Sequence, residues 1–266
     1  MHHRAHRLMA IVVAATLLAG CSGSASDETG STPDPYGLVA PATLTVATEG
    51  TYRPFTFHEG GTGDLTGFDV EIIEAVAAKV GLEIDFAEAP WDGIFAGLDV
   101  GRFDVIANQV SINPEREAKY LFSEPYTVSP GVIVVKEEDT SISSFDDLDG
   151  KTTAQSLSSN WYQLALDSGA HVEAVEGWAQ AVTLIEQGRV DATINDKLTY
   201  LDYEKTNAPT GLKIAAETDD PARNAFVFTT DKADLVAAVD RALAELRADG
   251  TLATISAKYF GEDVTK

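Results

Sequence analysis

The sequence predicts an α/β fold. From residue 43 onward, short runs rich in β-branched residues alternate with runs whose apolar residues recur at helical spacing, the pattern of sheets covered by helices. Residues 43–266 suffice for one large domain or for two lobes of about 100 residues each. An internal echo favours two similar lobes, because GRFDVIAN at 101–108 is matched by GRVDATIN at 188–195.

The chain begins with a stretch typical of an export signal. Residues 1–20 carry histidines and two arginines first, then an apolar run, then small residues. About a dozen apolar residues are too few for a transmembrane helix, which needs roughly 20. The run LAGC at 18–21 resembles the lipobox of bacterial lipoproteins, which implies cleavage before Cys21 and acylation of its thiol. Cys21 is the only cysteine, so we expect no disulfide.

Residues 21–42 are rich in Ser, Gly, Pro, Thr and Asp and show no helix or strand period, so we predict a lipid-anchored flexible tether. The formal net charge is −23, with the acidic residues spread along the chain. This charge excludes nucleic acid as a plausible partner and indicates a solvated surface. An apolar content of 44% predicts a sizeable core beyond the tether.

The first series of elements starts with a strand at 43–48. The helix at 69–80 follows, because Val70, Ile73, Ala77 and Val80 share one helical face. The remaining elements of this series are a strand at 82–86, a helix at 92–98 and a strand at 103–107.

The second series has the same alternation. Its predicted strands are 132–135, 152–155, 172–175 and 190–194, and its predicted helices are 161–167 and 179–187. Helices at 232–248 and 252–259 close the chain.

Ligands of open α/β sheets bind beyond the carboxyl ends of the strands, so the residues that follow each strand are the candidate site. They comprise Glu49 and Tyr52 after the first strand; Asn108, Gln109, Ser111 and Arg116 after the strand at 103–107; Ser156, Ser159 and Asn160 after the strand at 152–155; and Asp196 after the strand at 190–194. Trp91 lies at a helix start near another strand end.

This set suits an α-amino acid. Arg116 offers a planar fork for a carboxylate, and Ser159 and Asn160 lie where a helix begins, with unpaired N–H groups and a partial positive charge. Asp196 and Glu49 offer negative charge for an ammonium group.

Each residue also has a plainer interpretation. Arg116 suits an exposed surface position, Ser159 or Asn160 an ordinary N-cap with Gln163 in the first turn, and Asp196 the cap of the next helix. The rings of Tyr52 and Trp91 suit the core as well as a ligand stack.

Several segments resemble the extracellular solute-binding proteins of ABC importers for polar amino acids, over nearly all of 43–266. The most specific are GFDVE at 67–71, SINPER at 111–116 and FSEPY at 122–126; AELRADGT at 244–251 and YFG at 259–261 match the end of the family.

The resemblance implies a two-lobed periplasmic-binding-protein (Venus flytrap) fold with two crossover strands, near 127–130 and 222–225. Lobe 1 would comprise 43–129 and 225–266, and lobe 2 would comprise 130–224. The resemblance further implies a monomer that closes around its ligand and delivers it to a membrane permease with an ATPase subunit.

By the same resemblance, Arg116 binds the ligand carboxylate with Ser111 and the N–H groups near Ser159, and Asp196 holds the ammonium. Tyr52 and Trp91 flank the side chain. Glu49 stands where many relatives have Asp, and the loop SLSSN at 156–160 departs from the Gly-Thr form common in the family.

NQVSIN at 108–113, EGTY at 49–52 and the closing residues 260–266 look like those of cystine-binding members, so cystine is the expected ligand. A pocket of Ser, Asn, Gln and aromatic rings would also lack a dedicated counter-charge for an acidic or basic side chain. Glutamine, or another polar amino acid, fits the same facts.

A different class is also represented on this fold, because cyclohexadienyl dehydratases resemble the family and act on small carboxylates in the same cleft. They need a positioned acid or base. Neither His58 nor His171 follows a predicted strand end in the cleft, so we expect a binding protein rather than an enzyme. A sensory input is the third class, but no predicted transmembrane or signalling segment supports it.

We expect no metal and no other cofactor, because the sequence has neither a His/Cys ligand cluster nor a glycine-rich phosphate loop.

Overall fold

The computed structural model describes residues 34–266, which form two main sheets and one small one. The predicted leader at 1–20, Cys21 and the tether up to residue 33 lie outside the described residues. Within 34–266, none of the helices combines the length and the apolar character needed to cross a membrane.

The first sheet has the strand order β5-β1-β6-β14-β7, and β8 pairs with β14. Its strands are β1 (Thr43–Thr48), β5 (Glu83–Glu88), β6 (Val105–Ser111), β7 (Leu121–Phe122), β8 (Thr127–Ser129) and β14 (Ala222–Phe228). Strand β1 runs parallel to β5 and β6, whereas β14 runs antiparallel to β6.

The second sheet has the order β11-β10-β12-β9-β13. Its strands are β9 (Gly131–Lys136), β10 (Thr152–Gln155), β11 (His171–Ala174), β12 (Ala192–Asp196) and β13 (Leu212–Glu217). Strand β10 runs parallel to β11 and β12, whereas β9 runs antiparallel to β12. The two sheets therefore share one pattern of three parallel strands followed by an antiparallel one.

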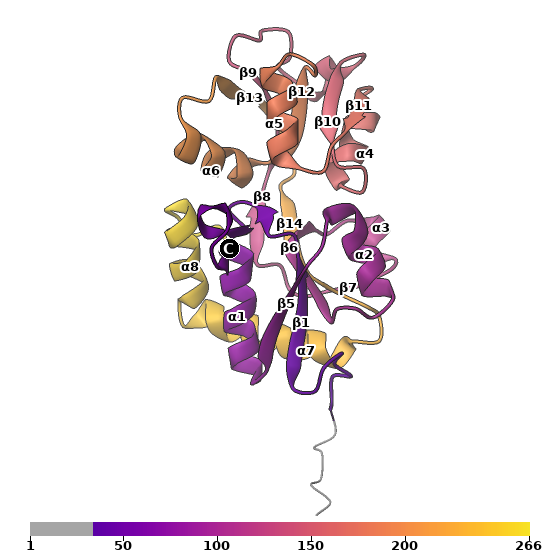
Figure 1. Ribbon diagram of the computed structural model, residues 1–266, viewed down its shortest axis with the longest axis vertical. Coiled ribbons are helices and arrows are strands. Elements are labelled where there is room, and N and C mark those ends of the chain that lie inside the picture. The colour runs from indigo at the N-terminus through magenta and orange to yellow at the C-terminus, as the bar shows by residue number, and fades with distance from the viewer. Residues whose placement is uncertain (1–33) are drawn as a thin grey trace, which may run out of the picture. The chain divides into compact units, whose positions relative to one another are not determined.

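The chain passes between the two sheets twice, after β8 and before β14, and β8 and β14 pair with each other beside these crossings (Figure 1). This arrangement confirms the two-lobed fold with two crossover strands. A small sheet of β2 (Thr51–Tyr52), β3 (Thr56–His58) and β4 (Leu65–Thr66) precedes the first long helix.

The helices are α1 (Phe68–Val80), α2 (Trp91–Asp99), α3 (Pro114–Glu117), α4 (Asn160–Asp167), α5 (Trp178–Glu186), α6 (Lys197–Asn207), α7 (Ala233–Ala248) and α8 (Thr251–Phe260). Two single-turn 3₁₀ helices span Glu59–Gly61 and Phe145–Leu148.

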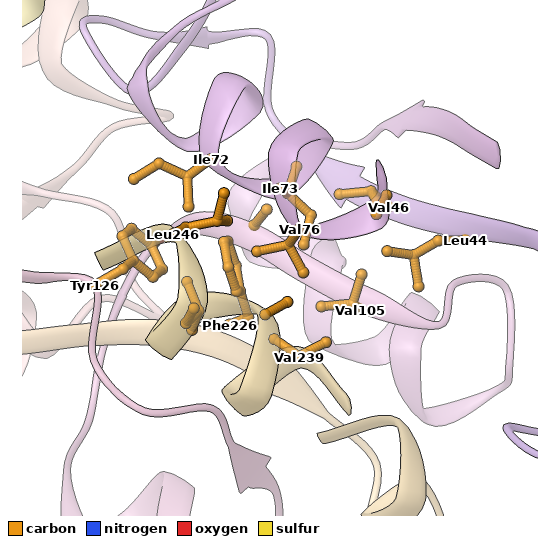
Figure 2. Packing of buried hydrophobic residues seen from close by; sticks show 14 of the residues in the cluster. Leu44, Val46, Ile72, Ile73, Val76, Val105, Tyr126, Phe226, Val239 and Leu246 are labelled. Atoms are coloured by element: carbon orange, nitrogen blue, oxygen red, sulfur yellow. The ribbon is translucent and has the colours of Figure 1, made fainter. Parts of the chain in front are cut away.

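The first sheet is covered on both faces, as its alternating residues require. Val105 and Phe226 join a cluster with α1, α7 and α8, whereas their neighbours Ile106 and Val227 join a cluster with α2. Figure 2 shows the first cluster, in which Ile72, Ile73 and Val76 of α1 meet residues of the sheet and of α7. Two further clusters cover the second sheet.

Of α6, only the start was expected, as the helix that Asp196 would cap, and β13 was not predicted. Only Leu198, Thr199 and Tyr200 of α6 are buried, with Tyr203 partly buried against Trp178, so the helix shows no long apolar stripe. In β13 only Leu212 is fully buried, which is why the strand pattern was weak there.

The internal echo places equivalent aspartates in the two sheets. Asp104 accepts a hydrogen bond from the backbone N–H of Thr45 at 3.0 Å, and Asp191 accepts one from Thr152 at 2.8 Å. Each aspartate thus ties the start of one central strand to its parallel neighbour. Asp104 is fully buried, whereas Asp191 is exposed.

Asp104 also orders residues that the sequence assigned to the flexible tether. It accepts the N–H of Val39 at 2.9 Å and pairs at 3.1 Å with Lys232, which in turn donates to the carbonyl of Gly37. Tyr36 and Leu38 pack against the core of the first sheet. The ordered chain therefore includes 34–42, because the buried ion pair supplies partners for its backbone.

We predict that Asp104→Ala lowers the free energy of unfolding by about 3–5 kcal/mol, because it leaves the Lys232 ammonium buried without its partner. Urea denaturation measures this. Asp191→Ala is the matched control, since it removes the equivalent strand bond at an exposed position and should cost about 1 kcal/mol. Equal losses of unfolding free energy in the two variants would contradict a stabilising role of the buried pair between Asp104 and Lys232.

Candidate functional site

A cavity of about 460 Å³ lies between the two lobes, beyond the carboxyl ends of their parallel strands. This volume falls within the range of small-molecule sites. Of the predicted residues, the cavity is lined by Glu49, Tyr52, Trp91, Asn108, Gln109, Ser156, Ser159 and Asn160. Ser111, Arg116 and Asp196 do not line it.

Arg116 lies just outside this cavity as a buried cation. The residue is 8% exposed, and its side chain donates to the carbonyls of Ser111 at 2.8 Å and of Ser158, in the other lobe, at 3.3 Å. The guanidinium carbon lies 5.4 Å from the ring centre of Trp91 and 5.3 Å from that of Phe95. The arginine is thus a buried residue of the cleft and not a surface one.

No carboxylate within residues 34–266 forms an ion pair with Arg116, and burial lowers its pKa to about 10. The short helix α3 holds the residue in place, with Asn113 accepting the N–H of Arg116 at 2.9 Å. A buried charge without a partner is costly. The site is therefore suited to an anionic group brought by a ligand.

Ser111 lies on the hinge side of Arg116. Its hydroxyl donates to the side-chain oxygen of Asn224 at 2.9 Å, and the residue lines a second cavity of about 250 Å³. Asn160 and Trp161 line both cavities.

The start of α4 faces the two cavities. Ser159 is the N-cap and accepts the N–H of Tyr162 at 3.0 Å, so Gln163 has no part in the cap. The N–H groups of Asn160 and Trp161, at the first two helical positions, have no acceptor within the helix. They present the partial positive charge of the helix start to the two cavities.

The rest of the loop before α4 bridges the lobes. Ser158 donates through its N–H at 3.1 Å and through its hydroxyl at 2.5 Å to Asp92. Ser156 donates to the carbonyl of Glu176 at 3.1 Å.

Asp196 takes the plainer of its two sequence interpretations, as the N-cap of α6. It accepts the N–H of Leu198 at 2.8 Å, the hydroxyl of Ser129 at 2.5 Å and the side-chain amide of Gln109 at 3.1 Å. Only 1% of the residue is exposed, and burial raises its pKa. Its contact with a ligand ammonium stays a prediction.

Glu49 lines the cavity directly. The side chain of Asn108 donates to it at 2.6 Å, yet burial dominates and raises the pKa of Glu49 to about 7, with the charges of Asp92 and Glu176 adding to the effect. Glu88 and Glu176 also line the cavity. The lining thus contains two acidic residues besides Glu49 that the sequence analysis did not place there, and one of these, Glu88, is bonded to His58.

Aromatic rings from both lobes line the cavity. Tyr52 and Trp91 were predicted; Trp161 and Trp178 were missed, although each begins a helix after a strand end. The Tyr52 hydroxyl donates to Asn195 at 2.8 Å and accepts from Thr199 at 3.2 Å, so it bridges the lobes. Trp161 packs so closely on Gly131 at the hinge that a Cβ there would lie 2.4 Å from its ring.

Gln109 connects the cavity to the hinge. Its backbone has a φ of 48°, in the left-handed region, and its side-chain oxygen accepts the hydroxyl of Thr127 at 2.9 Å. Its N–H donates to Asp69, which also accepts the Tyr126 hydroxyl at 2.6 Å. Burial raises the pKa of Asp69 to about 7.

The chain belongs to the bacterial extracellular solute-binding proteins, family 3, whose model matches residues 44–262. It is a substrate-binding protein, as two lobes with a cavity between them also indicate.

Among its relatives, the L-cystine-binding protein TcyA of Bacillus subtilis (strain 168) is 53% identical over 223 residues, which cover 84% of this chain and 83% of that protein. The L-cystine solute receptor of Neisseria gonorrhoeae, in its unliganded open conformation, is 46% identical with a TM-score of 0.58, covering 84% of this chain and 95% of that one.

An ancestral arginine-binding protein bound to arginine is 35% identical with a TM-score of 0.78, covering 83% of this chain and 99% of that one. The arginine-bound structure thus superposes better than the more identical open one. The higher TM-score with the ligand-bound protein is expected, because hydrogen bonds such as those of Tyr52 and Ser158 hold the two lobes of this structure together.

We predict that Asp69→Asn flattens the pH dependence of stability between about pH 4 and 7. Because the pKa of Asp69 is about 7 in the folded protein and near 3.8 in the unfolded one, the folded state binds more protons in this window. The free energy of unfolding therefore falls as pH rises to about 7 and this contribution is constant above it.

Asparagine keeps an oxygen that can accept from Gln109 and Tyr126, so the fold should persist. Urea denaturation of both proteins from pH 4.5 to 8 measures the difference between their unfolding free energies at each pH. Parallel curves would show that Asp69 titrates at its ordinary value.

Proposed function

We propose that this protein is the substrate-binding lipoprotein of an ABC importer of polar amino acids and that its ligand is cystine. Ligand binding closes lobe 1 (43–129 and 225–266) on lobe 2 (130–224), and the closed monomer delivers the ligand to a permease and its ATPase subunit. The protein carries out no reaction of its own.

The observation that carries the proposal is the buried Arg116 guanidinium, which has no acidic partner within the described chain and is bonded to carbonyls of both lobes. A ligand carboxylate would neutralise it, supported by the start of α4. Because Ser158 contributes to this site from the second lobe, a ligand bound to Arg116 favours the closed state.

Cystine is favoured over glutamine by two facts. Two relatives, TcyA and the gonococcal receptor, are named for cystine. The cavity also holds carboxylates from several strand ends, which suit a ligand with more than one ammonium group. A basic amino acid would use the same carboxylates, so arginine belongs among the ligands to be tested.

The dehydratase alternative rests on Glu49, a cavity carboxylate whose pKa of about 7 suits a general base. No histidine of residues 34–266 lines the cavity to act with it: His58 bonds to Gly63 and Glu88, and His171 is exposed. Turnover of prephenate or arogenate by the purified protein would establish this alternative.

We further propose that Cys21 carries the lipid anchor, with 1–20 as the removed leader and the residues after Cys21 as the tether. We predict that the protein fractionates with membranes when produced in bacteria and that a variant with residues 1–21 replaced by an export signal without a lipobox is released into the soluble extracytoplasmic fraction, because it is cleaved but has no thiol to acylate. Membrane retention of the variant would contradict the anchor.

We predict that L-cystine raises the stability of the wild-type protein in a thermal-shift screen of the common amino acids plus cystine, by about 2.7 kcal/mol at 100 times its Kd. Arg116→Ala should abolish this shift, because the carboxylate then enters a site without its counter-charge.

Arg102→Ala is the control, since Arg102 is exposed and its replacement should leave the shift caused by cystine unchanged. A shift with glutamine or arginine alone would keep the class of protein and replace the ligand. Cystine binding to Arg116→Ala within a few-fold of wild type would reject the proposed site.

A further inference from the structure

The N-terminus of α5 opens on the same cavity as that of α4. The residues Gly177, Trp178, Ala179 and Gln180, which form the N-cap and first turn, all line the cavity. Because the N-cap is Gly177, no side chain caps the helix. The first N–H groups of the nine-residue helix therefore lack an acceptor within it and present a partial positive charge.

A second, independent observation at this place is an unpartnered buried donor. Gln155 ends β10, is 3% exposed and lines the cavity, yet its Nε2 has no hydrogen-bond partner in residues 34–266. The backbone carbonyl of Gln155 accepts the N–H of Val175 at 3.1 Å, which holds Gln155 next to the turn that enters α5. The terminal torsion of a glutamine is soft, so the amide can turn toward a ligand.

Trp178 adds another such donor. Its indole Nε1 is buried and has no partner within the described residues, although its ring packs edge-on against Tyr203 at 5.6 Å. Buried donors without acceptors cost about 1–3 kcal/mol each. Trp91, which lines the cavity on the first lobe, has a third such donor, whereas Gln155 and Trp178 both flank the turn into α5 in the second lobe. An acceptor that arrives with the ligand would satisfy the pair beside α5.

We propose that Gln155, Trp178 and the N-terminus of α5 form a distal subsite for a second carboxylate, so that the cavity takes a ligand with an amino-acid head group at each end. Cystine is such a ligand. The proximal carboxylate lies at Arg116 and the start of α4, and Glu49 and Glu176 supply charge for the ammonium groups. This proposal rests on the proposed function, which assigns the proximal end.

Two adjacent strands explain why one cavity has two such ends. β10 and β11 are parallel neighbours, with Gln155 paired to Ala174, and each leads into a helix at the same edge of the sheet. The helices α4 and α5 therefore begin on one side of the second lobe, where their positive ends can bind the two carboxylates of a single molecule.

The test is isothermal titration of the protein with L-cystine and with the mixed disulfide of L-cysteine and cysteamine, which lacks only the distal carboxylate. We expect the analogue to bind wild type more weakly than cystine by about tenfold or more. Gln155→Met, which keeps the length of the side chain but removes the amide donor, should lower cystine affinity and leave analogue affinity nearly unchanged.

Gly177→Asp tests the helix end without threatening the fold. Gly177 has extended backbone with a φ of 177°, an added Cβ would meet nothing within 4 Å, and Asp is a favourable N-cap. Its carboxylate should compete with and repel the distal carboxylate, so cystine should bind at least about tenfold more weakly than to the isosteric control Gly177→Asn, with no such difference for the analogue.

Equal affinities of wild type for cystine and the analogue would overturn the distal subsite while leaving the proposed function in place. An equal loss for both ligands in Gln155→Met and Gly177→Asp would do the same. Failure of the proposed function is separate: wild type would then bind neither cystine nor the analogue, or Arg116→Ala would bind both as wild type does.

Discussion

The site depends on the burial of the Arg116 guanidinium between two lobes without a carboxylate beside it. Elsewhere in the described chain, the other nine-tenths-buried cation, Lys232, lies next to Asp104 and stabilises the base of the first lobe. At Arg116 the neighbours are carbonyls and aromatic faces, which orient the charge but do not neutralise it. The buried, unpaired charge of Arg116 therefore has a desolvation cost that a carboxylate ligand would offset.

The two lobes contribute different chemical groups to the site. The first lobe contributes the cation and the carboxylate Glu49, and the second contributes two helix starts that lack acceptors for their N–H groups. Neither lobe alone surrounds a ligand. Binding and closure are therefore one equilibrium, with the hydrogen bonds of Tyr52 and Ser158 across the cleft available only when the lobes are together.

Buried acids connect this cleft to the hinge. Asp196 holds the hydroxyl of Ser129 at one crossover, and Gln109 holds that of Thr127 while bonding to Asp196 and Asp69. Burial raises the pKa of both aspartates. Gln109, which lines the cavity, therefore contacts two buried acids and the crossover residue Thr127 at once.

The sequence by itself determined the α/β class, the two equivalent strands of the echo and most of the strand-end residues, because periodicity and strand ends are local features. The sequence also identified Arg116 as a candidate for binding a carboxylate. Only the tertiary structure decided that Asp196 is occupied as a cap, that residues 34–42 pack on the first lobe, and that Gln155 and Trp178 lack partners. Those facts depend on which side chains meet across the two lobes and the sheet, and no local pattern of residues encodes the distances involved.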